Sequence, residues 1–286
     1  MHKLNVEDTY FYSNNLIRVK DKLLDLSTPK VMGIVNCTPD SFYSGSRKKT
    51  EKEVLNQVEK HLNEGADIID LGGYSSRPGA QEIDTKEEIS RVIPFIKQIK
   101  KEFNTTISLD TFRSEVARQG LEEGVDIIND ISAWEIDHQL LEVVSKYKCP
   151  YILMHMKGTP STMQNKTQYA NIFNEVIHFL SEKLEILQQK GINDVIIDPG
   201  FGFGKNLEEN YELLNNLSAF NILNKPILAG ISRKSMIYNK LETTPELSLN
   251  GTTVLNTIAL KNGASILRVH DVKEAVEAVK IVAQLR

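Results

Sequence analysis

Short apolar segments rich in Val, Ile and Leu alternate along the chain with longer segments in which apolar residues recur every three or four positions. This alternation predicts strand–helix units whose strands form a parallel sheet. The strands are expected at Lys30–Asn36, Ala66–Leu71, Thr106–Asp110, Val125–Asn129, Tyr151–His155, Val195–Asp198, Pro226–Gly230 and Ser265–Arg268. Each is followed by a plausible helix, so the pattern predicts eight units.

Local signals for helix starts and ends support these units. The clearest helix is expected at about Asn171–Lys190, and its apolar stripe should face the sheet. Helix starts are expected at the capping-box pairs Thr50/Glu53, Thr85/Glu88 and Asp271/Glu274, and helix ends at Gly65, Gly124, Gly191 and Gly263.

Eight parallel strand–helix units in one chain favour a closed barrel, because a doubly wound open sheet usually has fewer strands and a topological switch point. The length of 286 residues allows one large domain or two modest ones, but no low-complexity linker divides the chain. We therefore predict a single α/β domain over residues 1–286, a (β/α)₈ TIM barrel. Residues 1–29 form an N-terminal extension in which Leu16–Val19 and Lys22–Leu26 pair as a hairpin that closes the bottom of the barrel.

Composition narrows the class of protein. The hydrophobic fraction of 41% is enough for a full core, and the net charge of −4 gives no basic field for nucleic acid or anionic membranes. Two cysteines are too few for a disulfide framework, and no apolar segment is long enough to serve as a membrane span. These features predict a cytoplasmic protein with neither a nucleic acid nor a membrane partner.

Polar residues lie at the ends of the predicted strands or directly after them, where the active site of such barrels lies. In chain order they are Asn36, the Gly72–Gly73 turn with Arg77, Asp110, Asn129, His155, Asp198, Ser232–Arg233–Lys234, Arg268 and His270. One such residue is usually a turn former or a helix cap. Because many of them converge on one rim, a binding or catalytic site is the better interpretation.

One glycine-rich segment is similar to a phosphate-binding loop but does not fit it. A Walker motif whose lysine is Lys205 would need glycine where Pro199 stands and serine or threonine where Asn206 stands. The dinucleotide-binding fingerprint fails as well, since Lys205 and Leu207 occupy the third-glycine positions of its two possible frames. Both of these nucleotide-binding motifs are therefore excluded.

Several segments instead resemble the dihydropteroate synthase family. The segments Met32-Gly-Ile-Val-Asn-Cys-Thr-Pro-Asp-Ser-Phe42 and Asp70-Leu-Gly-Gly-Tyr-Ser-Ser-Arg-Pro-Gly-Ala80 are similar to its first two signatures. Further matches begin at Ser108, Ile128, Leu153, Asp198, Ser232 and Arg268, in family order. The resemblance covers roughly residues 30–280 and implies condensation of 6-hydroxymethyl-7,8-dihydropterin pyrophosphate with p-aminobenzoate to 7,8-dihydropteroate and pyrophosphate.

The resemblance gives the strand-end residues a role in binding the pterin. A pterin presents a ring N–H beside an exocyclic amine, a donor pair that one carboxylate can accept, and we assign this role to Asp198. Asn129 and Lys234 would bind the remaining polar edge of the ring. Asp110 would form the floor of the site and stabilise positive charge that develops on the pterin, and Arg268 would lie against the pterin face.

The pyrophosphate is expected to be bound by Asn36, Arg77, Arg268 and His270. The resemblance also implies one Mg²⁺ ion held by Asn36, with few other protein ligands, as is usual for this cation. Because an aromatic amine is already neutral and nucleophilic at pH 7, catalysis should lie in leaving-group departure, with an SN1-like course. We expect Asp110, Lys234, Arg268 and His270 to be the catalytic residues.

The resemblance places p-aminobenzoate, and the sulfonamides that would compete with it, against Phe42, Ser76, Pro78, Phe203 and Ser235. Loops of about Thr38–Thr50 and Tyr74–Thr85 would act as lids over the site. The first loop departs from the usual family wording, because Ser44 stands where many members have aspartate.

Two other functions were weighed. A methyltetrahydrofolate-using methyltransferase domain would share the pterin-binding barrel, but the chain carries no cobalamin module and its anion site fits pyrophosphate better. A paralogue that binds pterin without turnover is favoured only by the altered first loop. The family also tends to form homodimers, for which the apolar segment Leu247–Ala259 is a candidate surface.

Overall fold

The computed structural model describes residues 15–37, 47–75, 82–163 and 167–285. Its main sheet has eight parallel strands in the order β8-β7-β6-β5-β4-β3-β10-β9. They are β3 (Lys30–Asn36), β4 (Ile68–Gly72), β5 (Thr106–Asp110), β6 (Ile127–Asp130), β7 (Tyr151–Met154), β8 (Val195–Asp198), β9 (Leu228–Ala229) and β10 (Ile266–Val269). A parallel bridge between Ile197 and Ile227 joins β8 to the start of β9. This bridge brings the two edges of the sheet together, and the predicted barrel is confirmed.

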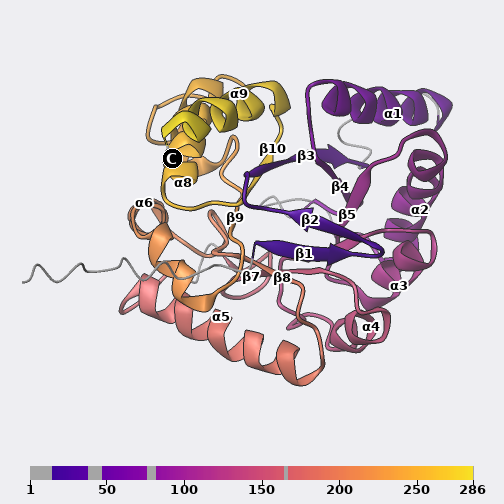
Figure 1. The fold of residues 1–286 in the computed structure, drawn as a ribbon, viewed down its shortest axis with the longest axis horizontal. Helices are drawn as coiled ribbons and strands as arrows, with labels where there is room; N and C mark the ends of the chain where they lie inside the picture. Colours follow the sequence, from indigo (N-terminus) through magenta and orange to yellow (C-terminus); the bar gives the residue numbers. More distant parts are fainter. Residues whose placement is uncertain (1–14, 38–46, 76–81, 164–166, 286) are drawn as a thin grey trace, which may run out of the picture.

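Helices surround the sheet (Figure 1). They are α1 (Arg47–Asn63), α2 (Thr85–Glu102), α3 (Ser114–Glu122), α4 (Gln139–Tyr147), α5 (Ile172–Gln189), α6 (Leu207–Asn215), α7 (Ser235–Tyr238), α8 (Leu249–Lys261) and α9 (Val272–Val282), with 3₁₀ helices at Leu217–Leu223 and Ala283–Leu285. Among the described residues, no helix is both long and apolar enough to cross a membrane.

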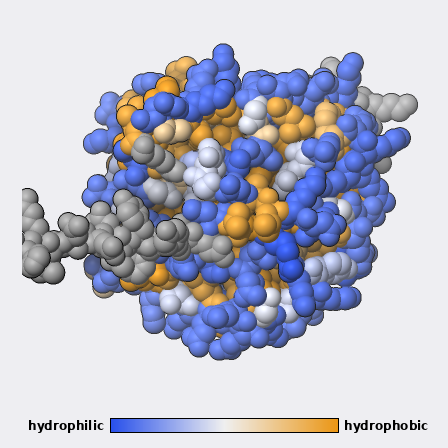
Figure 2. Space-filling model, in the orientation of Figure 1, coloured by the Kyte–Doolittle hydropathy of each residue, from blue (hydrophilic) through white to orange (hydrophobic). Residues whose placement is uncertain are grey.

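The hairpin at the N-terminal end is also confirmed. Strands β1 (Leu16–Val19) and β2 (Lys22–Asp25) pair antiparallel, and Figure 1 shows them lying across the centre of the ring of helices. The hairpin residues Ile17 and Val19 are buried in one cluster with residues from seven barrel strands, Met32, Ile68, Ile127, Ile152, Ile196, Leu228 and Ile266. Figure 2 shows a hydrophobic patch near the middle of this face, one of several there. The exposed large apolar side chains of the hairpin are Leu16 and Leu23.

The strand alternation separates two apolar layers. Strand residues such as Val31, Ile69 and Leu71 pack outward against the helices in the largest core cluster. Their neighbours Met32 and Ile68 point inward and form the floor of the barrel with the hairpin. The inward positions nearer the carboxyl ends of the strands are therefore the ones that can build a site.

The structure corrects two predicted helix starts and one cap. Helix α1 begins at Arg47, three residues before Thr50. Helix α2 is capped by Asp84, whose side chain accepts a hydrogen bond from the Glu87 backbone N–H, so Thr85 is already helical. Asp271 does precede α9, but its side chain makes no cap hydrogen bond because it pairs with Arg233.

The other helix predictions are confirmed. Helix α5 spans nearly the predicted residues, and its cap Asn171 accepts a hydrogen bond from the Asn174 backbone. The four predicted terminal glycines have φ between 75° and 101° and follow the ends of α1, α3, α5 and α8: Gly65, Gly124, Gly191 and Gly263. A positive φ at this position is the usual reason for glycine there.

Candidate active site

The upper interior of the barrel is polar. Each of four strands carries a polar residue two positions after an inward apolar residue of the floor: Asp70 after Ile68, Asn129 after Ile127, Asp198 after Ile196 and Arg268 after Ile266. Because side chains alternate along a strand, all four polar residues point into the barrel near the carboxyl ends of the strands. Asp110, at the end of β5, lies on the same side.

Arg268 binds two carboxylates across the barrel. Its Nε donates to Oδ2 of Asp70 at 2.6 Å, and its Nη2 donates to Oδ2 of Asp110 at 2.6 Å. Asn129 Nδ2 donates to the same Asp70 carboxylate, at 3.3 Å from Oδ2. These contacts bring Asp110, Asn129 and Arg268 together, as the sequence predicted, around Asp70.

The carboxylates and the guanidinium influence each other's protonation. Burial raises the pKa of Asp110 to about 7, and the nearby Arg268 guanidinium opposes this rise. Burial alone would lower the pKa of Arg268, but Asp70 and Asp110 raise it above its ordinary value. Arg268 therefore stays charged and supplies a fixed positive group at the mouth of the barrel, the end at which the carboxyl ends of the strands lie.

Asp198 and Lys234 flank Gly230 on the other side of the mouth. A Cβ atom placed on Gly230 would lie 3.8 Å from both Oδ2 of Asp198 and Nζ of Lys234. Oδ1 of Asp198 accepts the N–H of Gly200 at 2.7 Å, which fixes the orientation of the carboxylate. Burial raises the pKa of Asp198, and Lys234 opposes that rise. Burial also lowers the pKa of Lys234 to about 8.

An apolar wall stands beside these charges. Its buried members form a separate cluster at the carboxyl end of the barrel, with Tyr74 packed against it: Phe112, Ile131, Met154, Met156, Met163 and Phe203. Lys234 Nζ lies 4.6 Å from the centre of the Phe203 ring. The mouth therefore combines an apolar surface for a flat ring with a carboxylate and cations at its edge, a typical composition for a small-molecule site.

Asn36 and His270 complete the described part of the mouth. A Cβ on Gly72 would lie 3.9 Å from both Oδ1 of Asn36 and Oδ2 of Asp110, so these two side chains lie on either side of the end of β4. His270 Nδ1 lies 3.1 Å from the Ser232 hydroxyl, which also accepts the His270 backbone N–H at 3.2 Å. Ser232 thereby orients the imidazole.

Some predicted site residues lie outside the described residues. They are Phe42, Ser76, Arg77 and Pro78, and Ser44 of the altered first loop lies there too. Of the remaining residues predicted to bind p-aminobenzoate, Phe203 belongs to the apolar wall. Ser235 is half-buried at the first position of α7, next to Lys234.

Two polar residues singled out in the sequence stabilise the mouth rather than face it. Arg233 donates to both carboxylate oxygens of Asp271 at 2.8 Å and to the carbonyl oxygens of Pro245 and Glu246. It thus ties the segment after β9 to the segment after β10. His155 is buried beside α5, with its ring centre 4.9 Å from that of Phe179, and its Nδ1 contacts Lys205.

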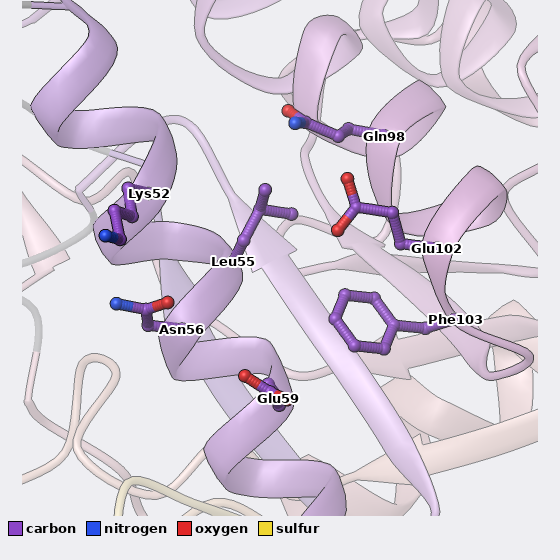
Figure 3. A pocket seen from close by; sticks show the side chains of 7 residues that line it. All are labelled: Lys52, Leu55, Asn56, Glu59, Gln98, Glu102 and Phe103. Carbon is purple, nitrogen blue, oxygen red and sulfur yellow. The ribbon is translucent and has the colours of Figure 1, made fainter.

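Two grooves in the described part of the chain lie away from this mouth, one of them between α5 and the 3₁₀ helix Leu217–Leu223. Figure 3 shows a groove lined by Lys52, Leu55, Asn56, Glu59, Gln98, Glu102 and Phe103. These residues lie on α1 and α2 or directly after α2, so the groove is on the outside of the barrel. Among the described residues, no group of three or more His, Cys, Asp or Glu side chains is placed to hold a metal ion.

Comparison with known proteins decides the family. The family model described as "Pterin binding enzyme" matches residues 32–270. The dihydropteroate synthase of Escherichia coli K12 is 45% identical over 261 residues, which cover 91% of this chain and 92% of the relative. This chain belongs to the dihydropteroate synthase family. The predicted enzyme class, a transferase of folate biosynthesis, is confirmed with it.

Other dihydropteroate synthases are also similar to this chain in sequence and in structure. The Haemophilus influenzae enzyme is 42% identical over 94% of this chain and 96% of its own length. A Yersinia pestis dihydropteroate synthase solved with a sulfonamide drug has a TM-score of 0.90 at 40% identity, covering 95% of this chain and 99% of that one. A Xanthomonas albilineans synthase in complex with 7,8-dihydropteroate has a TM-score of 0.85 at 34% identity, covering 94% and 98%.

Asp70 is the residue of this dihydropteroate synthase site that sequence reasoning missed. It belongs to the second signature, but it lies one residue before the end of the predicted strand Ala66–Leu71, whereas the predicted site residues lie at strand ends or after them. Its signal was a carboxylate at an inward position of an otherwise apolar segment, where a charge is costly unless it is paired. The partner is nearly two hundred residues away in the sequence, so only the fold could show the pair.

Proposed function

We propose that this protein condenses 6-hydroxymethyl-7,8-dihydropterin pyrophosphate with p-aminobenzoate, giving 7,8-dihydropteroate and pyrophosphate. The observation that carries the proposal is the placement of the buried Asp198 carboxylate and the Lys234 ammonium group, both next to Gly230, beside an apolar wall and near the Arg268 guanidinium. This arrangement supplies a ring-binding surface, an acceptor for two adjacent N–H donors and a cation for the leaving group at one end of the barrel.

The pterin would lie against the apolar wall with its polar edge toward Asp198. The carboxylate can accept the ring N–H and the exocyclic amine together, and its orientation is already set by the Gly200 N–H. Lys234 can donate to the pterin carbonyl or to a ring nitrogen, and Asn129 can bind the remaining edge. The same charges disfavour a purely apolar ligand, because burying them unpaired would be costly.

Arg268 is suited to stabilise the departing pyrophosphate. Its Nε and Nη2 groups are held by Asp70 and Asp110, while its Nη1 group has no acceptor in the described part of the chain. The Nη1 donors can therefore bind pyrophosphate as the bond between the pterin methylene carbon and the phosphate oxygen breaks. The leaving group keeps the electron pair, and negative charge on Asp110 stabilises the cation left on the pterin.

The aromatic amine then attacks the methylene carbon and loses one proton. It needs no strong base, because the amine is neutral at pH 7 and its acidity rises once the new C–N bond forms. His270, oriented by Ser232, directly follows β10, the strand that carries Arg268, and would bind the pyrophosphate. The residues of the chain thus act mainly on departure of the leaving group rather than on the nucleophile.

One Mg²⁺ ion fits this site. Asn36 supplies an amide oxygen next to the Asp110 carboxylate, and Mg²⁺ prefers oxygen ligands, few of them from the protein, with substrate phosphates and water filling the rest. When bound, the ion would neutralise charge on the pyrophosphate. We assign Asn36 as its protein ligand.

We also propose a cytoplasmic homodimer that binds neither nucleic acid nor membranes. The net charge of −4 and the two buried cysteines, both free, support the location and the absence of an anionic polymer as partner. The segment around α8 carries large apolar side chains that are exposed in the single chain, Leu247, Val254 and Ile258. A second copy could cover them.

The test is product formation by the purified full-length protein. Given both substrates and Mg²⁺, it should form dihydropteroate and pyrophosphate, and a chelator should stop turnover until Mg²⁺ is restored. Absence of product despite calorimetric binding of the pterin pyrophosphate would instead identify a pterin-binding protein without turnover. Turnover that is indifferent to the chelator would remove Mg²⁺ from the proposal and leave the reaction standing.

A further inference from the structure

The segment Gly200–Lys205 resembles a phosphate-binding loop in sequence, but its lysine turns inward. Lys205 is only 4% exposed. Its Nζ lies 2.9 Å from the Gly200 carbonyl oxygen, 3.0 Å from that of Phe203 and 3.0 Å from Nδ1 of His155. The His155 carbonyl oxygen lies 3.3 Å away. Lys205 thus binds its own loop and the end of β7 rather than facing a ligand.

The backbone of this loop is shaped around the ammonium group. Gly200, Gly202 and Gly204 all have positive φ, and in this conformation the carbonyl oxygens of Gly200 and Phe203 meet the Lys205 ammonium group. A Cβ atom on Gly200 would lie 2.0 Å from the His155 carbonyl oxygen, so no other residue fits there. Because the negative ends of several carbonyl dipoles converge on one point, the conformation needs a cation at that point.

The rest of the loop is held by other side chains. Tyr169 donates its hydroxyl to the Gly204 carbonyl at 2.9 Å, and the Gly202 N–H donates to Oδ1 of Asn210 at 2.6 Å. Three side chains thus hold the loop: Lys205 at its centre, Tyr169 and Asn210. Of these three, only Lys205 carries a positive charge.

The same loop carries three features of the candidate site. Asp198, the last residue of β8, leads into the loop, and the Gly200 N–H orients its carboxylate. The Phe201 carbonyl accepts a hydrogen bond from Lys234 Nζ, and the Phe203 ring lies beneath that ammonium group. If the loop relaxed, Asp198 and Lys234 would lose their relative placement.

We propose that Lys205 is a positioning residue of the pterin site, whose buried ammonium group holds the Asp198–Lys205 loop in the conformation that presents Asp198 and Lys234 to the pterin. This inference rests on the proposed function, since it assigns the pterin to that pair. Burial lowers the pKa of Lys205 to about 7, and Asp198 opposes this fall. The ring of acceptors helps to retain the charged form at neutral pH.

The experiment compares Lys205→Met with Lys100→Met. Lys100 is the control because, like Lys205, it donates to a backbone carbonyl; it is partly buried, also binds the Asp126 carboxylate at 2.5 Å, and lies at the floor end of the barrel. For each variant we would measure kcat, both KM values, the thermal midpoint and hydrogen exchange in the peptide 198–206.

For Lys205→Met we expect the KM for the pterin pyrophosphate to rise at least about tenfold, because several buried acceptors lose their donor. The KM for p-aminobenzoate should change less than about twofold, since the loop acts on the pterin edge. Exchange of the Gly200 and Gly202 amides should accelerate. Lys100→Met should lower the thermal midpoint and leave both KM values and the 198–206 exchange unchanged.

A folded Lys205→Met with wild-type pterin KM and unchanged loop exchange would overturn the proposal, and so would a loss confined to thermal stability. If Lys205→Met does not fold, Tyr169→Phe loosens the same loop more gently, and the pterin KM should rise about threefold, the loss of one hydrogen bond. Exchange and calorimetric binding of the pterin pyrophosphate need no turnover, so they test Lys205 even if the wild-type protein forms no product.

Discussion

The floor and the mouth of the barrel are built from the same strands, two residues apart, and they differ in chemistry. The floor is apolar and is sealed by the hairpin residues Ile17, Val19 and Leu26. The mouth contains charged groups at the next inward position of those strands, such as Asp70 after Ile68 and Asp198 after Ile196. A single two-residue step therefore separates the stabilising layer from the candidate active site.

The two layers contribute differently to the free energy of folding. Floor residues contribute by leaving water, roughly 25 cal/mol for each Å² of apolar surface buried. Buried carboxylates of the mouth lose the stabilisation that hydration gives them. The positive charges of Arg268 and Lys234 restore only part of it. The raised pKa of Asp110 records that incomplete compensation. A polar substrate can supply the missing partners, so the mouth is built for binding rather than for stability.

Removing the carboxylate of Asp198 should have the largest effect on the reaction. Asp198→Ala deletes the acceptor of two pterin donors, and a charged hydrogen bond contributes about 1.5–3 kcal/mol, so pterin affinity should fall at least about a hundredfold. Calorimetry with the pterin pyrophosphate measures this. The protein should remain folded, because burial of the carboxylate is only partly compensated in the free protein.

The matched control is Asp67→Asn at the floor end, where the carboxylate accepts the Val31 N–H at 2.9 Å and lies 3.4 Å from Lys30. This variant should bind the pterin pyrophosphate as the wild type does. Undiminished pterin affinity in Asp198→Ala would remove Asp198 from the pterin site.

Arg268→Ala should produce the next largest effect, because it removes the cation that faces the leaving group and leaves Asp70 and Asp110 without their common partner. We expect kcat to fall about a hundredfold or more, in the range found when one charge-stabilising donor is deleted. Arg268→Lys should recover little of this, since one ammonium group cannot reproduce the planar fork. Steady-state kinetics and pyrophosphate inhibition measure the change, and wild-type kinetics would place the anion site elsewhere.

A smaller effect should come from pH. Burial lowers the pKa of Lys234 to about 8, so at pH 9 roughly a tenth of the molecules keep this charge, and kcat/KM for the pterin pyrophosphate should fall about tenfold from its plateau. In Lys234→Arg the part of the fall centred near pH 8 should vanish, because arginine does not titrate there. An unchanged alkaline limb in that variant would assign it to another group.

Titration of Lys234 should raise the stability of the protein with rising pH, whereas it lowers kcat/KM. Its pKa is about 8 in the folded protein and 10.5 in an ordinary lysine. Between these values the unfolded chain binds more protons than the folded protein, so the free energy of unfolding rises with pH. The unfavourable contribution of Lys234 is greatest below pH 8 and is lost above pH 10.5. Denaturant titrations of wild type and Lys234→Met over this range would show it.

The floor should give the smallest effect on the reaction. Ile17 is 2% exposed, and Ile17→Ala should lower the free energy of unfolding by about 2–4 kcal/mol through lost burial and a residual cavity, while kcat/KM stays the same. Leu16→Ala is the control on the same strand, since Leu16 is 46% exposed and its loss should change stability by less than about 0.5 kcal/mol. A fall in kcat/KM for Ile17→Ala would show that the two layers are coupled.

Helix starts show why sequence prediction worked unevenly. The apolar stripe predicts a helix at about Asn171–Lys190, and Asn171 does cap α5. Glu88 was predicted to complete a capping box with Thr85, but it is buried and binds Thr111 and Arg113 instead. A local pattern cannot reveal that a helix residue is drawn inward by partners in the distant segment between β5 and α3.

The hydrophobic pattern by itself determined the eight strands, the hairpin and the end of the barrel at which the polar residues gather, because alternation and strand polarity are local properties of the chain. The tertiary structure alone decided how the charges pair. Arg268 meets Asp70 and Asp110, and Lys205 meets His155, only after the barrel has closed. A hydrogen bond needs atoms within about 3 Å, and residues distant in sequence reach that separation only through folding.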